Sequence, residues 1–131
     1  MIMKSLWLCA LLLFSSVPAM AKSEAIDVSI IQLIAAPAQY NEKYVRVVGF
    51  LNLEYQKDAI YLHKEDLFRG ITRNGLWVIA NKKMYRGQEK YSRQYVVLEG
   101  TFRVANKGHN NLWSGAIENI EHIEVLAPIP E

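Results

Sequence analysis

Apolar and polar residues alternate along two long segments of the chain, 44–51 ("YVRVVGFL") and 95–102 ("YVVLEGTF"). A period of two is typical of a β-strand with one buried face. Two shorter apolar runs, 59–63 ("AIYLH") and 76–80 ("LWVIA"), predict further strands. We expect the first run to form a hairpin with 44–51. The second is apolar throughout, so we expect it near the centre of the sheet.

A fifth segment, 115–126 ("GAIENIEHIEVL"), carries an isoleucine at every third position. This spacing fits neither the period of a strand nor that of a helix. It predicts either a strand with a bulge near Asn119 or a C-terminal helix.

A short helix is predicted ahead of the first strand. Ser29 is a suitable N-cap, and Gln32 stands three residues later, where it completes a capping box. Val28 and Leu33 are spaced for a hydrophobic staple, and Pro37 ends the helix. The helix is amphipathic, so its apolar face is expected to cover one side of the core.

The connections between the strands also carry structural signals. The segment 64–70 ("KEDLFRG") predicts one helical turn or an ordered loop that ends at Gly70. The segment 81–93 is polar and basic, and it is compatible with a short helix. The glycines of the two long strands, Gly49 and Gly100, fall at equivalent positions of the alternating pattern. Glycine inside a strand indicates a bulge, a sharp bend or the close approach of another backbone. Bends at such glycines are what a small closed barrel needs to turn its corners.

This order of elements resembles the OB-fold, a five-stranded Greek-key barrel that commonly has a helix between its third and fourth strands. The resemblance covers about residues 44–126 and predicts a mainly β domain. The chain also resembles a scattered group of small exported bacterial proteins. The shared features are a helix opening, the run "YLHKED" (61–66), and Gly108-His109 followed by Ser-Gly-x-Ile. The first resemblance implies a ligand that crosses strands two and three, between the loops that join strands one–two and four–five.

The first 21 residues have the pattern of a signal peptide. Met1–Lys4 is basic, 5–14 is a nearly unbroken apolar run, and Ala19-Met20-Ala21 matches a signal-peptidase site. The apolar run is shorter than a membrane-spanning helix needs to be. We expect cleavage after Ala21, a periplasmic or secreted location, and one domain over 22–131 without a transmembrane segment. A buried N-terminal helix is the alternative.

Composition adds two constraints to this picture. The single cysteine, Cys9, lies in the predicted signal peptide, so the mature chain has no disulfide and no cysteine metal ligand. Residues 69–107 contain nine Lys and Arg against two acids, whereas 108–131 contain four acids and no Lys or Arg. These halves either neutralise each other in the fold or leave a basic face for an anionic partner. An exported chain is not expected to meet chromosomal nucleic acid.

Two polar clusters are candidates for a site. One stands at the end of the second strand and includes Tyr61, His63, Glu65 and Asp66. The other lies in the loop before the last strand and includes His109, Asn110, Asn111, Trp113 and Ser114. On the OB-fold template the two clusters are neighbours. Aromatic faces and forked Arg donors suit sugars and anions. The ligand-binding candidates are His63, Arg69, Arg73, His109, Asn111 and Trp113.

We therefore expect a noncatalytic binding module for an envelope protein or for an anionic or sugar-containing ligand, with no cofactor and no catalytic residues. One alternative is a metal-dependent hydrolase that uses His63, Glu65 or Asp66, and His109, a ligand set that zinc accepts. Another is an inhibitor or immunity-type protein that docks through a basic face. For Trp113 and the loop glycines, packing is the competing interpretation.

Overall fold

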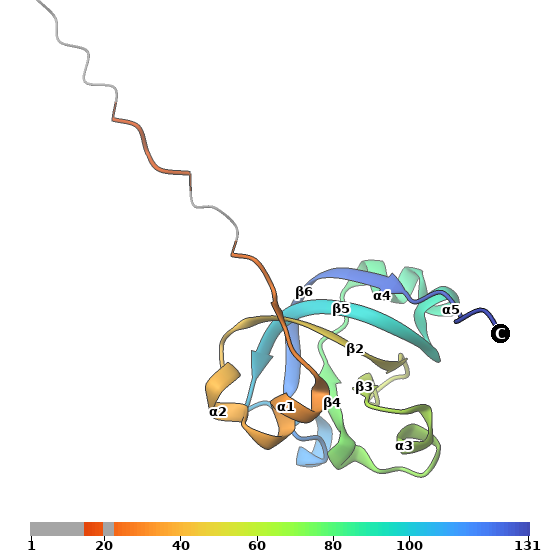
Figure 1. Cartoon of the computed structure of the whole chain (residues 1–131). Coiled ribbons are helices and arrows are strands. Elements are labelled where there is room, and N and C mark those ends of the chain that lie inside the picture. The colour runs from red at the N-terminus through yellow and green to blue at the C-terminus, as the bar shows by residue number, and fades with distance from the viewer. Residues whose placement is uncertain (1–14, 20–22) are drawn as a thin grey trace, which may run out of the picture.

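The computed structural model describes residues 15–19 and 23–131. Residues 15–19 have no regular secondary structure, and the rest of the predicted signal peptide lies outside the described residues. Short helices alternate with strands along the remainder of the chain (Figure 1). The strands are β1 (Ile26–Asp27), β2 (Tyr44–Asn52), β3 (Ala59–Tyr61), β4 (Gly75–Val78), β5 (Gln94–Arg103) and β6 (Ala116–Val125). The α-helices are α1 (Ile30–Ala35), α2 (Pro37–Tyr40), α3 (Lys64–Phe68), α4 (Lys82–Arg86) and α5 (Gln88–Tyr91), and two 3-10 turns are η1 (Thr72–Asn74) and η2 (His109–Asn111).

Five of the strands close into a barrel. The sheet order is β1-β2-β3-β4-β6-β5, and an additional pairing of β2 with β5 completes the ring. All ring pairings are antiparallel except that of β4 with β6. The molecule is therefore the mainly β, OB-like five-stranded barrel that the sequence predicted. The sequence did not predict β1, which adds a short parallel pairing to β2.

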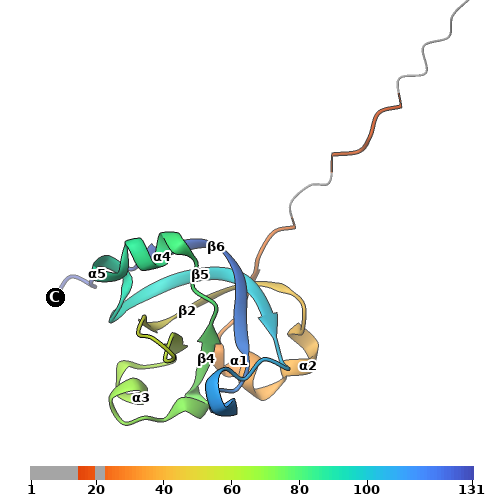
Figure 2. The same ribbon diagram turned by 180° about the vertical axis from the view of Figure 1, so that it is seen from behind.

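Helices lie at both ends of this barrel, as Figures 1 and 2 show from opposite sides. At one end α1 buries Ile30 and Leu33 in the core, and the capping box of Ser29 and Gln32 is confirmed. At the other end α4 and α5 contribute Met84 and Tyr91 to the same core. The barrel interior is filled by Val, Leu and Ile side chains together with Phe102.

The two interior glycines mark close approaches between neighbouring strands. A Cβ atom on Gly49 would lie 2.6 Å from the Tyr61 carbonyl oxygen, and one on Gly100 would lie 2.6 Å from that of Glu118. Each distance is well inside van der Waals contact, so no larger residue fits without a backbone shift. The similar segments 44–51 and 95–102 are direct antiparallel partners in the barrel. Their likeness follows from this shared geometry.

The segment 115–126 is a strand, so the helix alternative is wrong. In β6 the register with β5 shifts between Glu99 and Thr101, and Asn119 has a φ of 49°. The bulge predicted near Asn119 is therefore confirmed. It lets Ile117, Ile120 and Ile123 all reach the core despite their spacing of three.

Three boundaries differ from the sequence prediction. β3 ends at Tyr61 rather than at residue 63, because His63 already has the N-cap position of α3. β4 begins one residue earlier than expected and ends at Val78. Pro37 ends α1 as predicted, but it also begins α2, since proline is tolerated in the first turn of a helix. In the part of the chain that the structure describes, no helix has both the length and the apolar character needed to cross a membrane.

Candidate functional site

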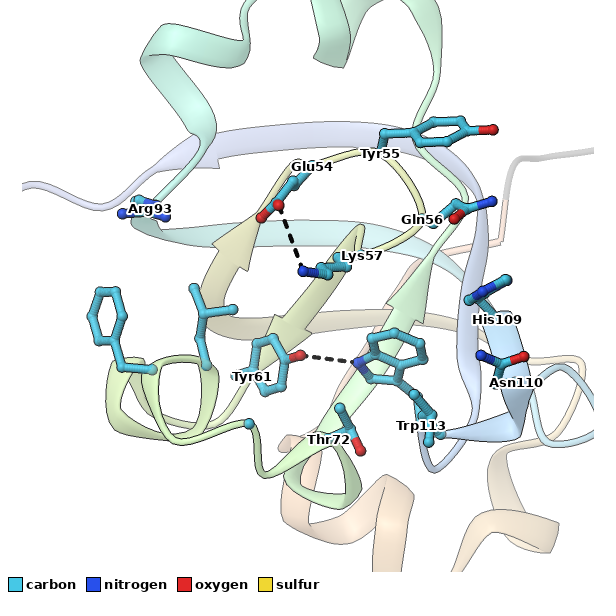
Figure 3. A pocket seen from close by; sticks show the side chains of 14 residues that line it. Glu54, Tyr55, Gln56, Lys57, Tyr61, Thr72, Arg93, His109, Asn110 and Trp113 are labelled. Atoms are coloured by element: carbon cyan, nitrogen blue, oxygen red, sulfur yellow. Dashed lines mark hydrogen bonds and ion pairs between the residues drawn. The ribbon is translucent and has the colours of Figure 1, made fainter.

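A groove of about 570 Å³ crosses one face of the barrel beside β3 (Figure 3). Three connections surround it: the β2–β3 loop, the region from α3 to η1, and the β5–β6 loop with η2. This volume is typical of a small-molecule site. The lining residues are Glu54, Tyr55, Gln56, Lys57, Tyr61, Leu67, Phe68, Gly70, Thr72, Arg93, His109, Asn110, Leu112 and Trp113.

The β2–β3 loop is held in place by hydrogen bonds to the segment that contains α4 and α5. Gln88 Nε2 donates to the Leu53 carbonyl at 2.8 Å, and the Leu53 backbone N–H donates to Ser92 Oγ at 2.9 Å. The buried Asp58 carboxylate accepts hydrogen bonds from the Glu54 N–H and from the Tyr85 hydroxyl. The helical segment thus fixes the loop that forms one wall of the groove.

Burial raises the pKa of Asp58, and its two hydrogen bonds act in the opposite direction. The hydrogen bond between Tyr85 and Asp58, together with burial, raises the pKa of Tyr85 to about 12. Tyr85 therefore keeps its proton throughout the physiological pH range, and its hydroxyl donates a hydrogen bond to the Asp58 carboxylate. This bond joins the helical segment to the base of the loop.

The β5–β6 loop folds back across Trp77. A Cβ on Gly108 would lie 2.5 Å from the Trp77 ring, so this position requires glycine. The backbone N–H of Trp113 donates to the Lys107 carbonyl at 3.1 Å, and the Ser114 hydroxyl donates to the Arg73 carbonyl at 2.7 Å. These bonds present the turn η2 at the edge of the groove.

The floor of the groove is a second, smaller core. Trp113 and Tyr61 are each only 2% exposed, and they pack with Ala59, Leu67 and Trp77. Trp113 Nε1–H donates to the Tyr61 hydroxyl oxygen at 3.1 Å. The ring centroids of Trp77 and Trp113 are 4.8 Å apart. The floor is therefore packed and joined by a buried hydrogen bond, whose acceptor is the Tyr61 hydroxyl (Figure 3).

The rim of the groove carries exposed aromatic and charged side chains. Tyr55 is 84% exposed and Phe68 is 62% exposed. The Arg93 guanidinium lies 5.7 Å from the centroid of the Phe68 ring, within the range of a cation–π contact. Lys57 and Glu54 form an ion pair at 3.7 Å. Aromatic faces and hydrogen-bonding groups thus meet around one hollow.

Backbone conformations that L-residues rarely adopt concentrate at this groove. Gln56, Arg93 and Asn110 have φ angles of 58°, 59° and 56°, and all three line it. Asparagine tolerates this region, but for Gln and Arg it costs about 1–2 kcal/mol per residue. The barrel therefore holds two large polar side chains at the groove in spite of local strain.

The structure divides the sequence candidates into two sets. His109 and Trp113 line the groove, and Asn111 stands beside Asn110 in the same turn. Arg69 and Arg73 are exposed on the α3–η1 region, and neither lines the groove. His63 is also exposed and lies outside it, at the start of α3. Of the two clusters expected to be neighbours, the first reaches the groove through Tyr61 rather than through His63.

Two of the candidate metal ligands, Glu65 and Asp66, have structural positions in α3. Asp66 is buried, and its carboxylate accepts two hydrogen bonds. One comes from the His63 backbone N–H at 3.1 Å and the other from Asn74 Nδ2–H at 2.9 Å. Glu65 and Asp66 both lie in the first turn of α3, where the positive end of the helix dipole stabilises negatively charged side chains. Within residues 15–19 and 23–131, no three His, Asp or Glu side chains are grouped closely enough to hold a metal ion.

Among the nine Lys and Arg residues of 69–107, Arg103 alone forms ion pairs with described residues. Arg103 contacts Glu118 at 3.2 Å and also Glu42 at 2.9 Å. None of the other eight Lys and Arg residues of 69–107 forms an ion pair with a described residue. Arg93 is one of these eight and is the one that lines the groove.

Sequence reasoning missed Phe68 and Arg93 as site residues. Phe68 follows Leu67 in a short helix, and nothing in the local pattern indicates which of the two faces solvent. Arg93 precedes β5 with a left-handed backbone that its sequence does not signal. Tyr55 was detectable, because it stands in the loop that the OB-fold template assigns to ligand binding.

In comparisons with known proteins, no family model, curated protein or solved structure matches this chain.

Proposed function

We propose that this protein is an exported, noncatalytic binding module whose ligand is a sugar-containing or anionic molecule held in the groove beside β3. One observation carries the proposal. The groove lies between the β2–β3 and β5–β6 loops, the position at which OB-like barrels take extended ligands, and it combines exposed aromatic faces with converging polar groups.

The chemistry of the lining supports binding rather than catalysis. Ser114, which follows Trp113 in the β5–β6 loop, is the hydroxyl nearest His109 in the sequence. Its hydroxyl donates to the Arg73 carbonyl, whereas a serine nucleophile would donate to its histidine base. Tyr55 and Phe68 offer flat apolar faces on which the C–H face of a sugar ring packs. Gln56, Thr72 and Asn110 supply uncharged hydrogen-bonding groups around them.

The proposed location rests on the sequence. The basic start, the apolar run and the Ala19-Met20-Ala21 pattern within residues 1–21 support export. Outside the cytoplasm, saccharides of the envelope are far more abundant than oligonucleotides, which favours the saccharide among the ligand classes of OB-like barrels.

The test is a binding screen of the purified protein on an array of neutral and acidic oligosaccharides. We expect binding to be weakened at least tenfold by Tyr55→Ala and by His109→Ala. His122→Ala is the matched control, since His122 is exposed on β6 and does not line the groove. Binding that survives both groove variants, or an array on which nothing binds while an envelope protein is captured through another face, would contradict the proposal.

A further inference from the structure

The Tyr61 hydroxyl lies on the floor of the groove and has one hydrogen to donate. Its oxygen accepts the Trp113 indole N–H at 3.1 Å, and an indole can only donate. No hydrogen bond from the Tyr61 hydroxyl to a described residue accompanies it. Burial raises the pKa of Tyr61, so the hydroxyl keeps its proton. A buried donor therefore remains open on the groove floor, where Figure 3 shows it beside Trp113.

A second donor group lies at the rim. Arg93 is anchored by its backbone, whose N–H donates to the Leu51 carbonyl at 2.7 Å, and its guanidinium lies over the Phe68 ring. It has no ion pair with a described residue. The guanidinium has five N–H donors and no acceptor, and it matches the two oxygens of a carboxylate. The single carboxylate of the lining, Glu54, is paired with Lys57.

We propose that the ligand is an acidic saccharide, with the anionic group on Arg93 and an acceptor oxygen of the sugar on the Tyr61 hydroxyl. This inference rests on the proposed function and adds the chemical class of the ligand. Both groups donate hydrogen bonds, so they match a molecule rich in acceptors. Carboxylate, sulfate and phosphate share this chemistry. The exposed rings of Tyr55 and Phe68 account for the sugar rather than a free anion.

The experiment compares trigalacturonic acid with its methyl ester, which has the same backbone without charge. In calorimetric titrations at low salt we expect the acid to bind at least tenfold more tightly than the ester. Arg93→Gln should remove this preference, and Arg86→Gln, an exposed arginine of α4 outside the groove, should retain it. Tyr61→Phe should weaken both ligands by about tenfold, the value of one hydrogen bond.

Thermal denaturation of each variant first establishes that it is folded. If Tyr61→Phe does not fold, the comparison of wild type with Arg93→Gln decides the result. Equal affinity for acid and ester, unchanged by Arg93→Gln, would overturn the acidic class and leave the saccharide function standing. Inorganic phosphate or sulfate that binds as tightly as the trisaccharide would overturn the sugar part. Failure of both trisaccharides would overturn this inference, while the oligosaccharide array tests the proposed function separately.

Discussion

At the scale of single residues, a few buried hydrogen bonds fix the groove. Asp58 is 5% exposed and joins the β2–β3 loop to Tyr85 of α4. Trp113 joins the β5–β6 loop to Tyr61 of β3. The two partners of each bond are separated by 27 and 52 residues, respectively. Such bonds are expensive to break because the abandoned partner remains buried.

Tyr85→Phe is expected to lower the free energy of unfolding by about 2 kcal/mol at neutral pH, since Asp58 loses a donor to its carboxylate. It should also flatten the alkaline loss of stability. The pKa of Tyr85 is raised from 10.0 to about 12, so between these values the unfolded chain releases a proton that the folded protein retains. Stability therefore falls as the pH rises through this window.

Denaturant unfolding measured from neutral pH to about pH 12 tests both expectations. Tyr85→Phe should lose stability with rising pH less steeply than the wild-type protein, but not lose this dependence entirely. The remainder comes from Tyr44, whose pKa is also raised to about 12, mainly by burial. Tyr55→Phe, at an exposed position of the same loop, should leave the stability at neutral pH unchanged. Equal slopes for wild type and Tyr85→Phe would show that the contact with Asp58 does not control this proton.

At the scale of elements, the alternating patterns predicted β2 and β5 almost to the residue. Their interior glycines follow from the barrel geometry, because β2 approaches β3 at Gly49 and β5 approaches β6 at Gly100. The capping box of α1 and the bulge in β6 were also readable from local sequence. The short strand β1 was not, since two residues carry no period and depend on a neighbouring strand.

Gly49→Ala is expected to destabilise the barrel by about 2–3 kcal/mol, because the new Cβ meets the Tyr61 carbonyl at 2.6 Å and Ile30 Cδ1 at 2.7 Å. The comparison is Val48→Ala, the adjacent residue on the outer face, which is half exposed and should change stability by less than about 1 kcal/mol. Thermal denaturation of the two variants measures the difference. Similar melting temperatures would contradict the close approach of β2 to β3.

At the scale of the whole molecule, the barrel core begins at Val28, beyond the predicted signal peptide. Helices at both ends of the barrel contribute side chains to this core. Most basic residues of 69–107 remain without ion pairs among the described residues, and the net charge of the molecule is formally +2. The fold therefore leaves its positive side chains available to solvent and ligands.

Export of the chain in a bacterial host should yield a periplasmic or secreted form that starts at Lys22. Signal peptidase needs small residues at the cleavage site, so Ala19→Arg combined with Ala21→Arg should block processing. Intact-mass measurement of the fractionated protein gives the N-terminus directly. As a control, Ala25→Arg lies beyond the site and should be processed normally. An intact chain that remains in the cytoplasm would contradict export.

The sequence by itself determined the strand segments, the glycine position inside each long strand, the cap of the first helix and the pattern of a signal peptide. These features depend on neighbours in the chain, so local periodicity and residue chemistry are sufficient to find them. Only the tertiary structure decided which candidates share a site. The groove joins residues of 54–57, 67–72 and 109–113 with Arg93, and their meeting depends on barrel closure. Backbone hydrogen bonds and buried contacts between distant segments, rather than local pattern, placed Arg93 and His109 in that groove and His63 outside it.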